Sequence, residues 1–292
     1  METTLRACGR ARCTPAQRPP SCQMSLLDLD AVPRTLLIPL AARAHGHRLF
    51  PWLDCQDVEA ESLLTCLQES SQPLLEDRIA VLNVLWRTRV LKSWGASFFK
   101  THPLGTGVTL GAGLSHHFQW LDTGGNHWID ADLLPVHALR ERLIHFTGGR
   151  HANRAIDLRQ MGWWQAVTSG LPQQPYWVLC EGVLMYFTPE QVFEVIHAFA
   201  ESAPVGSRLV LDAISHLGVG QARHSLSVSR TGAEFQWGLQ DTQELLAIHP
   251  RLRLSAHRSV AECYGWLGWA AETTWMPWTG APLYSMVMLE AA

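Results

Sequence analysis

The 292-residue sequence lacks an excess of basic residues and lacks any long apolar run. Its formal net charge is -3 at pH 7, so it offers no basic surface to hold a phosphate backbone, and nucleic acid is excluded as the expected partner. No apolar stretch approaches the roughly 20 residues needed to cross a bilayer, and the first residues lack the apolar core of a signal peptide. We therefore expect a cytoplasmic protein without membrane contact that acts on a small molecule.

Metal-ligand patterns are also missing. The seven cysteines form no CxxC pair, and the fourteen histidines show no HxxxH spacing on a predicted helix, so no metal site is expected. What is present is an apolar fraction of 47% with 17% charged residues, the composition of a compact globular protein. A chain of this length can bury an ample core.

The first 23 residues differ from the rest of the chain. They contain four arginines, the Pro19-Pro20 pair and one acid, Glu2, without a periodic apolar face, which predicts a disordered tail. We expect residues 24–292 to form a single domain. Within it, residues 34–76 are predicted to form a helical cap outside the main sheet, and the polar residues 216–240 are predicted to form a lid insertion.

Short apolar strands alternate with helices along most of the chain. This alternation predicts crossover connections and an α/β fold with a mainly parallel sheet. A long helix from about Leu74 to Lys100 leads into the first strand, and a tryptophan-rich piece without an assigned element precedes the last one. The expected strands lie at or near residues 108–110, 128–129, 155–157, 176–180, 208–214, 252–256 and 284–289.

The most informative stretch runs from Val108 to Asp132. Its apolar start breaks into Gly111-Ala112-Gly113, where missing side chains let the backbone approach a ligand closely. About twenty residues later a second apolar segment ends in Asp130 and Asp132, and carboxylates at such a position reach ribose hydroxyls in α/β nucleotide sites. The pair of signals predicts a cofactor that contains a nucleoside.

A dinucleotide is one candidate for this cofactor, and an NAD(P)-dependent oxidoreductase is therefore one alternative function. The dinucleotide fingerprint needs a third glycine where this chain has His116, because that glycine allows close packing above a pyrophosphate. S-adenosylmethionine, which has no pyrophosphate, fits better. Two further acids, Asp157 and Glu181, follow later predicted strands, and ligands of open α/β sheets bind at such strand ends.

Four segments resemble the successive cofactor motifs of the leucine carboxyl methyltransferase and polyketide O-methyltransferase family, especially its bacterial polyketide-type branch. The segments read GAGLSHHFQWLD, WIDADLLPVHALRERL, AIDL and CEGVLMYFTPEQV. The resemblance covers nearly everything from about Arg34 to the C-terminus. It implies a class I methyltransferase fold, with a seven-stranded, mostly parallel sheet whose last strand is reversed, extra N-terminal helices and a lid over the acceptor.

The resemblance also implies which residues contact S-adenosylmethionine. Gly111 and Gly113 would approach its amino acid end, and Asp132 would hold the ribose, with Asp130 as a near neighbour. Asp157 would contact the adenine.

Three further positions complete the set implied by the resemblance. Leu158 would contact the adenine, and Glu181 would lie near the methionine amino group. Arg87 would pair with the methionine carboxylate, and Arg89 is the alternative for that role.

The chain departs from the family pattern at one point. Family members usually read Asp-Thr-Arg after the glycine turn, whereas this chain reads Ser115-His116-His117. His116 and His117 are either new pocket residues or packed side chains without a catalytic role. The departure also leaves open a second alternative function, a non-catalytic S-adenosylmethionine-binding protein of the same fold.

Methyl transfer from a sulfonium depends mainly on aligning the reacting atoms, and a carboxylate acceptor needs no base, whereas a phenol would benefit from a nearby histidine. We expect an S-adenosylmethionine-dependent O-methyltransferase that acts on a small organic acid or a polyketide-like acceptor through a carboxylate. It would be a monomer or a homodimer. Candidate catalytic or acceptor-pocket residues are Tyr186, His216, Arg230, Trp237, His116 and His117.

Overall fold

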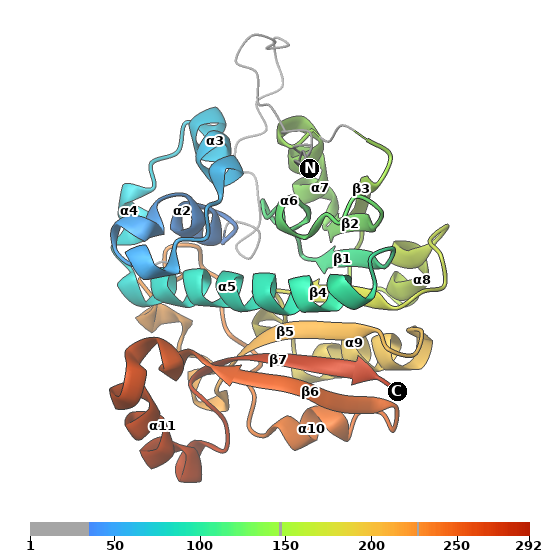
Figure 1. Cartoon of the computed structure of the whole chain (residues 1–292). Helices are drawn as coiled ribbons and strands as arrows, with labels where there is room; N and C mark the ends of the chain where they lie inside the picture. Colours follow the sequence, from blue (N-terminus) through green and yellow to red (C-terminus); the bar gives the residue numbers. More distant parts are fainter. Residues whose placement is uncertain (1–34, 146–147, 227) are drawn as a thin grey trace, which may run out of the picture.

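The computed structural model describes residues 35–145, 148–226 and 228–292, so the predicted N-terminal tail lies outside the described residues. Its centre is a seven-stranded sheet in the order β3-β2-β1-β4-β5-β7-β6 (Figure 1). The pairs from β3 through β5 are parallel, and β7 runs antiparallel to both β5 and β6. The strands are β1 (Thr106–Leu110), β2 (His127–Asp132), β3 (His151–Ala155), β4 (Tyr176–Cys180), β5 (Arg208–Ile214), β6 (Leu252–Ser259) and β7 (Tyr284–Ala291).

This order confirms the predicted α/β class with a reversed last strand. The chain starts in the middle of the sheet at β1, moves outward through β2 and β3, and then crosses back to β4 on the other side of β1. The switch between β1 and β4 creates a crevice at their carboxyl ends, where ligands of such sheets bind. Every residue of β1 and β4 is buried, as expected for parallel strands covered on both faces.

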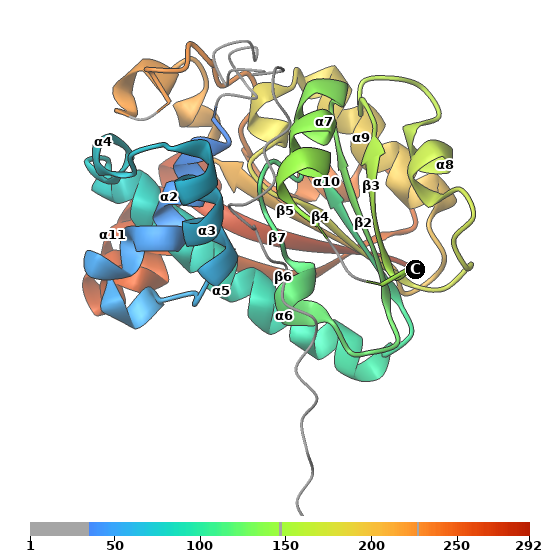
Figure 2. The same cartoon turned by 90° about the horizontal axis from the view of Figure 1, so that it is seen from above.

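Helices cover both faces of the sheet (Figure 2). The long helix α5 packs on one face, where Leu91 and Phe98 contact a cluster that includes Trp128 and Trp177. On the other face, Phe199 belongs to a second cluster with side chains from three helices. The helices around the sheet are α5 (Arg78–Thr101), α6 (Phe118–Leu121), α7 (Leu134–Leu143), α8 (Trp163–Thr168), α9 (Pro189–Ser202) and α10 (Thr242–Leu246).

The N-terminal helices lie outside the sheet and pack against α5 and α7. A third apolar cluster joins Leu40 to Leu63 and Leu139. The predicted helix from Leu74 is divided, because α4 ends at Leu75 and α5 starts after Asp77, whose carboxylate caps it by accepting from Ala80 N at 3.0 Å. The elements are α2 (Leu37–His45), η2 (Gly46–Arg48), η3 (Pro51–Leu53), α3 (Val58–Leu67) and α4 (Gln72–Leu75).

Between β5 and α10 the chain leaves the sheet and returns to the same point. His216 N donates to Leu239 O at 3.0 Å, and Leu239 N donates to Ile214 O at 2.7 Å. A Cβ at Gly238 would lie 2.5 Å from the carbonyl oxygen of Ser215, so this crossing requires glycine. We call residues 216–238 the insertion segment; it contains η5 (His216–Gly218) and η6 (Ala222–His224).

The tryptophan-rich piece forms a helix that the sequence did not predict. After η7 (Val260–Tyr264), α11 (Gly265–Thr279) lies between β6 and β7 at the end of the sheet (Figure 1). Among the helices of residues 35–145, 148–226 and 228–292, none has both the length and the apolar character to span a membrane.

Candidate functional site

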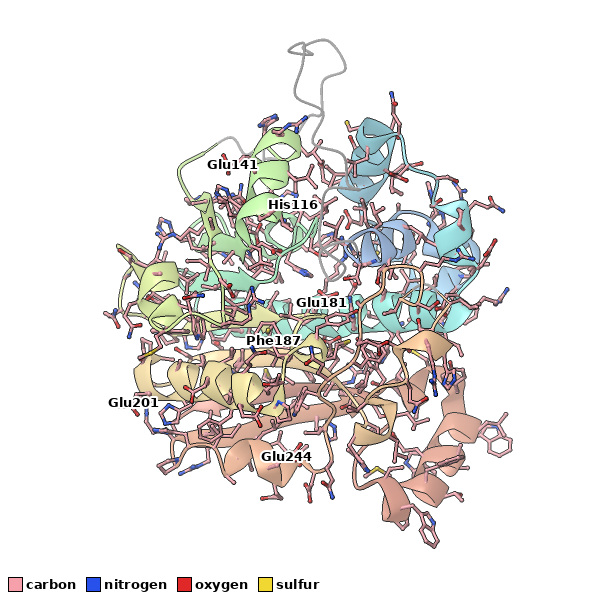
Figure 3. The ribbon with its side chains drawn as sticks, turned by 180° about the vertical axis from the view of Figure 1, so that it is seen from behind. His116, Glu141, Glu181, Phe187, Glu201 and Glu244 are labelled. Carbon is pink, nitrogen blue, oxygen red and sulfur yellow. The ribbon has the colours of Figure 1, made fainter. Side chains whose placement is uncertain are left out.

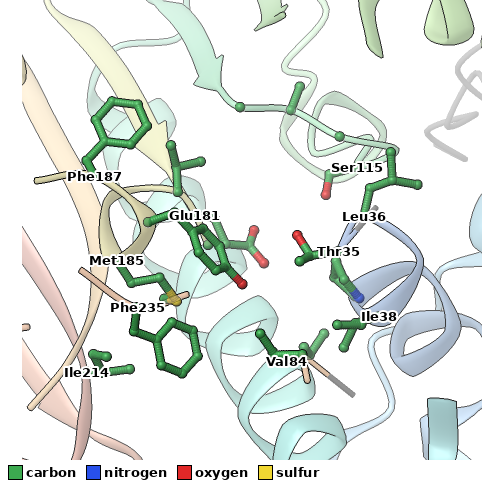
Figure 4. A pocket seen from close by; sticks show the side chains of 18 of the residues that line it. Thr35, Leu36, Ile38, Val84, Ser115, Glu181, Met185, Phe187, Ile214 and Phe235 are labelled. Atoms are coloured by element: carbon green, nitrogen blue, oxygen red, sulfur yellow. The ribbon is translucent and has the colours of Figure 1, made fainter. Parts of the chain in front are cut away.

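A cavity of about 740 Å³ opens at the carboxyl ends of β1, β2, β4 and β5. Its walls also come from α2, α5 and the insertion segment. Glu181, which follows β4, occupies the centre of the molecule in Figure 3. Figure 4 shows its side chain directed into the cavity, between Thr35 and Ile38 on one side and Met185 and Phe235 on the other.

The glycine turn after β1 forms one wall of the cavity. Gly111 and Gly113 have φ values of 68° and 51°, which favour glycine, and a Cβ at Gly111 would lie 2.3 Å from Val183 Cγ2. Gly113 N donates to Asp132 Oδ2 at 2.7 Å, and Leu133 N donates to Asp132 Oδ1 at 2.7 Å. Burial raises the pKa of Asp132, although these two backbone donors partly offset it. The turn and the carboxylate are therefore fixed relative to each other beside the cavity.

Asp130 does not line this cavity. Its carboxylate pairs with Arg140 of α7 and lies 2.8 Å from His151 Nε2. Burial alone would raise the pKa of Asp130, but Arg140 and His151 hold it well below its usual range. Arg140 Nη1 also donates to the carbonyl oxygens of Gly113 and Ser115, at 2.8 and 2.9 Å. Asp130 is thus linked to the glycine turn through Arg140 and, contrary to the prediction, does not lie where it could contact a ligand in the cavity.

Arg87 of α5 lines the cavity at the centre of a buried polar network. Its Nε donates to Glu181 Oε1 at 2.6 Å, and its Nη1 donates to Asp212 Oδ2 at 3.0 Å and to Tyr284 Oη at 2.9 Å. Tyr284 Oη in turn donates to Asp212 Oδ2 at 2.6 Å, and Gly182 N donates to Asp212 Oδ1 at 2.6 Å. The network fixes the guanidinium next to Glu181 at the floor of the cavity.

The carboxylate of Glu181 is charged, and within the described residues only one of its two oxygens accepts a directed hydrogen bond. Burial would raise its pKa, but Arg87 and His117 hold the pKa of Glu181 well below its usual range. Its Oε2 is buried and makes no directed hydrogen bond with the described residues, although His117 Nε2 lies 2.9 Å away. A buried carboxylate oxygen without a directed donor is suited to receive a donor from a ligand.

Asp157 and Leu158 line another part of the cavity. Arg159 holds the Asp157 carboxylate through two hydrogen bonds of 2.8 Å and lowers its pKa. Leu158 is buried and contributes apolar surface. Arg89, by contrast, does not line the cavity, and its Nη1 donates to the carbonyl oxygen of Trp52. Of the two arginines considered for a carboxylate partner, the structure brings only Arg87 to the cavity.

Some of the predicted acceptor-pocket residues line the cavity and others do not. Tyr186 lines the cavity, and burial raises its pKa to about 12. Arg230 pairs with the exposed Glu76 at 2.9 Å, away from the cavity. Trp237 lies in the apolar core. His216 does not line the cavity either.

His116 and His117 are buried and do not line the cavity. Burial lowers the pKa of His116 to about 4, against an opposing effect of Asp130. A histidine of this kind is neutral at physiological pH. The histidine of the cavity wall, His224, lies in the insertion segment and was not foreseen.

The comparisons with known proteins agree with this geometry. Residues 41–200 match the family described as leucine carboxyl methyltransferase. The chain is 27% identical over 235 residues to the tetracenomycin polyketide synthesis O-methyltransferase TcmP of Streptomyces glaucescens, a match that covers 80% of this chain and 85% of the relative. A solved DUF574 family protein from Streptomyces avermitilis shares the fold, with a TM-score of 0.50 and 11% identity over 86% of this chain and 98% of its own.

Fold, site and family match together define an S-adenosylmethionine-dependent methyltransferase. The chain belongs to the leucine carboxyl methyltransferase family, whose model covers more than half of it. The prediction of a methyltransferase with this cofactor is confirmed, and the NAD(P)-dependent alternative is set aside.

Proposed function

We propose that the protein transfers a methyl group from S-adenosylmethionine to a carboxylate oxygen of a small organic acid or a polyketide-like acceptor, and that the cavity holds both molecules. Its volume of about 740 Å³ lies within the range of about 300–1,000 Å³ typical of ligand pockets. The relative from Streptomyces glaucescens, named for polyketide synthesis, supports the acceptor class.

The residues around the glycine turn would hold the cofactor. The backbone of Gly111 and Gly113 lines the cavity and would face its amino acid end, and the fixed Asp132 carboxylate would accept from the ribose hydroxyls. Leu158 and Asp157 would contact the adenine. These residues line one continuous cavity, which supports their joint use.

The amino acid end of the cofactor carries an ammonium and a carboxylate group, and Glu181 and Arg87 offer the complementary charges. Glu181 Oε2 would accept from the ammonium group, since it lacks a directed donor within the described residues. Arg87 Nη2 makes no hydrogen bond with these residues, whereas Nε and Nη1 are engaged, so Nη2 would face the carboxylate.

The other half of the cavity would hold the acceptor. Its walls are largely apolar and aromatic, which suits a ring system better than a highly polar metabolite. Polar groups on these walls include Asp77, Asn83, Tyr186, His224 and Gln236. The apolar residues include Ile38, Val84, Met185, Phe187, Ile214, Val228 and Phe235.

One observation carries the choice of a carboxylate: two of the three titratable side chains on the acceptor walls, Tyr186 and Asp77, are not available as a base, which among the described residues leaves only His224 of the insertion segment. The bound cofactor supplies an electrophilic methyl group on a sulfonium. Tyr186 keeps its proton because burial raises its pKa to about 12, and Asp77 is engaged with Ala80 N and Ser225 Oγ. An acceptor that is already ionised needs no base, so the chain's task is to orient it and exclude water.

The test is a methylation assay with labelled S-adenosylmethionine and paired acceptors, such as naphthoic acid and naphthol. We expect methyl esters, which mild alkali cleaves, and no effect of His224→Ala on their rate of formation. Alkali-stable methyl ethers that depend on His224 would replace the proposal with phenol methylation. Binding of S-adenosylhomocysteine without transfer to any acid or phenol would support the non-catalytic alternative.

A further inference from the structure

Helix α11 carries an unusual set of uncovered tryptophans. Trp266, Trp269 and Trp278 expose 77%, 67% and 85% of their surface, and Trp275 exposes 54%. Large aromatic side chains gain most from burial, and an apolar surface of this size on one helix marks an interaction site. The figure of the whole chain shows why they are uncovered: α11 stands at the end of β6 and β7, away from the helices that cover the sheet (Figure 1).

The helix is apolar on all sides. Among its residues only Thr279 is buried within the chain. A helix without a polar face is normally enclosed by protein. Within the described residues, η7 packs against α11, and Glu272 accepts from Ser259 Oγ.

Charge distinguishes a protein partner from a lipid surface. Helices that lie on membranes combine an apolar face with lysine and arginine, which attract anionic headgroups. The sequence of α11, GWLGWAAETTWMPWT, contains no basic residue, and its one charged residue is Glu272. Tryptophan-rich surfaces with few charges are typical of the centres of protein interfaces.

The exposed area suits a second copy of this chain. With roughly 250 Å² for a fully exposed tryptophan, the four side chains present about 700 Å², close to the roughly 800 Å² that each partner contributes to a stable interface. Tyr264, Leu267 and Leu283 lie nearby in the sequence and are each more than half exposed, which extends the area. A twofold axis through α11 would cover the same patch on both subunits.

We propose that α11 forms the interface of a homodimer, with the tryptophans of two copies packed against each other. In such a dimer each subunit covers the exposed apolar surface of the other. The two copies are always present at equal concentration. The edge strand β6 precedes this helix, so the dimer would also place the two sheet edges near each other.

Sedimentation analysis of the full chain tests this proposal. We expect a species of twice 32.6 kDa at micromolar concentration. The double variant Trp266→Glu/Trp278→Glu should sediment as a monomer with an unchanged circular dichroism spectrum, since both side chains are exposed. The matched control is Val205→Glu, which places the same charge on another exposed apolar residue. Val205 precedes β5 and lies next to the C-terminal end of β7, whereas α11 precedes the start of β7.

Four results would overturn the proposal. The wild-type chain could sediment as a monomer throughout, or the double variant could remain dimeric. A monomer that binds vesicles of phosphatidylcholine and phosphatidylglycerol through the same tryptophans would assign α11 to a lipid surface instead. Loss of the dimer in the Val205→Glu control would show that the effect is not local to α11.

Discussion

His117 Nε2 lies 2.9 Å from Glu181 Oε2, at an angle that makes no directed hydrogen bond. Both side chains are buried, and the family resemblance places an arginine where this chain has His117. A histidine therefore stands beside the carboxylate proposed to receive the cofactor's ammonium group. Arg87 and Arg43 also influence Glu181, but arginine keeps its charge at all relevant pH values.

The first prediction concerns competition for Glu181 Oε2. His117 Nε2 lies 2.9 Å from this oxygen, which the cofactor's ammonium group would also approach. The variant His117→Ala should therefore bind S-adenosylhomocysteine more tightly than the wild type, as measured by calorimetry. The control is His224→Ala, which changes a histidine on the acceptor side of the cavity. Unchanged or weaker binding in His117→Ala would contradict the prediction.

The second prediction concerns the strand-end carboxylate Asp132. Loss of a hydrogen bond from a charged acceptor costs about 1.5–3 kcal/mol, so Asp132→Ala should weaken binding of S-adenosylhomocysteine by roughly 10- to 100-fold. Calorimetry measures the dissociation constant directly. The control is Asp241→Asn, which replaces the N-cap of α10 with an equally good cap far from the cavity. Unchanged affinity in Asp132→Ala would remove Asp132 from the proposed site.

The third prediction concerns Arg140, which joins Asp130 to the glycine turn. Arg140→Met removes one partner of a buried ion pair and should lower the free energy of unfolding by about 3–5 kcal/mol. Denaturant titration measures the change. The double variant Arg140→Met/Asp130→Leu should recover part of this loss, because no buried charge is then left alone. A loss below about 1 kcal/mol in the single variant would show that the pair is not coupled to folding.

The fourth prediction concerns stability in mild acid. The pKa of His116 is lowered to about 4 in the folded protein, against 6.5 for an unperturbed histidine. Between these values the unfolded chain binds the proton more readily, so stability should decrease as the pH falls from 6.5 to 4, by up to about 3 kcal/mol from this residue. His116→Gln should flatten that part of the curve, measured by denaturant unfolding at several pH values. An unchanged pH slope would contradict the prediction.

The sequence predicted best those cavity residues that directly follow the ends of parallel strands. Parallel strands end at one edge of the sheet, so Gly111, Asp132, Asp157 and Glu181 could be expected to converge without knowledge of any contact. The same reasoning misplaced Asp130. Asp130 lies on the same face of β2 as Asp132, but it is within the buried part of the strand rather than at its end, and Arg140 satisfies its charge there.

The sequence could not predict the network behind Glu181. Asp212 and Tyr284 meet Arg87 across separations of 125 and 197 residues, which only the packed fold creates. A signal for Asp212 did exist, because an acid within the apolar strand RLVLDAI must find a partner when buried. Helix α11 was missed for a different reason, since apolar residues on all sides leave no helical periodicity to read.

The crossing at Ile214 and Leu239 gives the insertion segment a property of its own. Because the segment begins and ends at one hydrogen-bonded point, its length and composition can change without moving β5 or the carboxylates at the strand ends. Foreign loops could therefore be grafted between His216 and Gly238 to change the acceptor walls, while the residues proposed to hold the methyl donor stay in place.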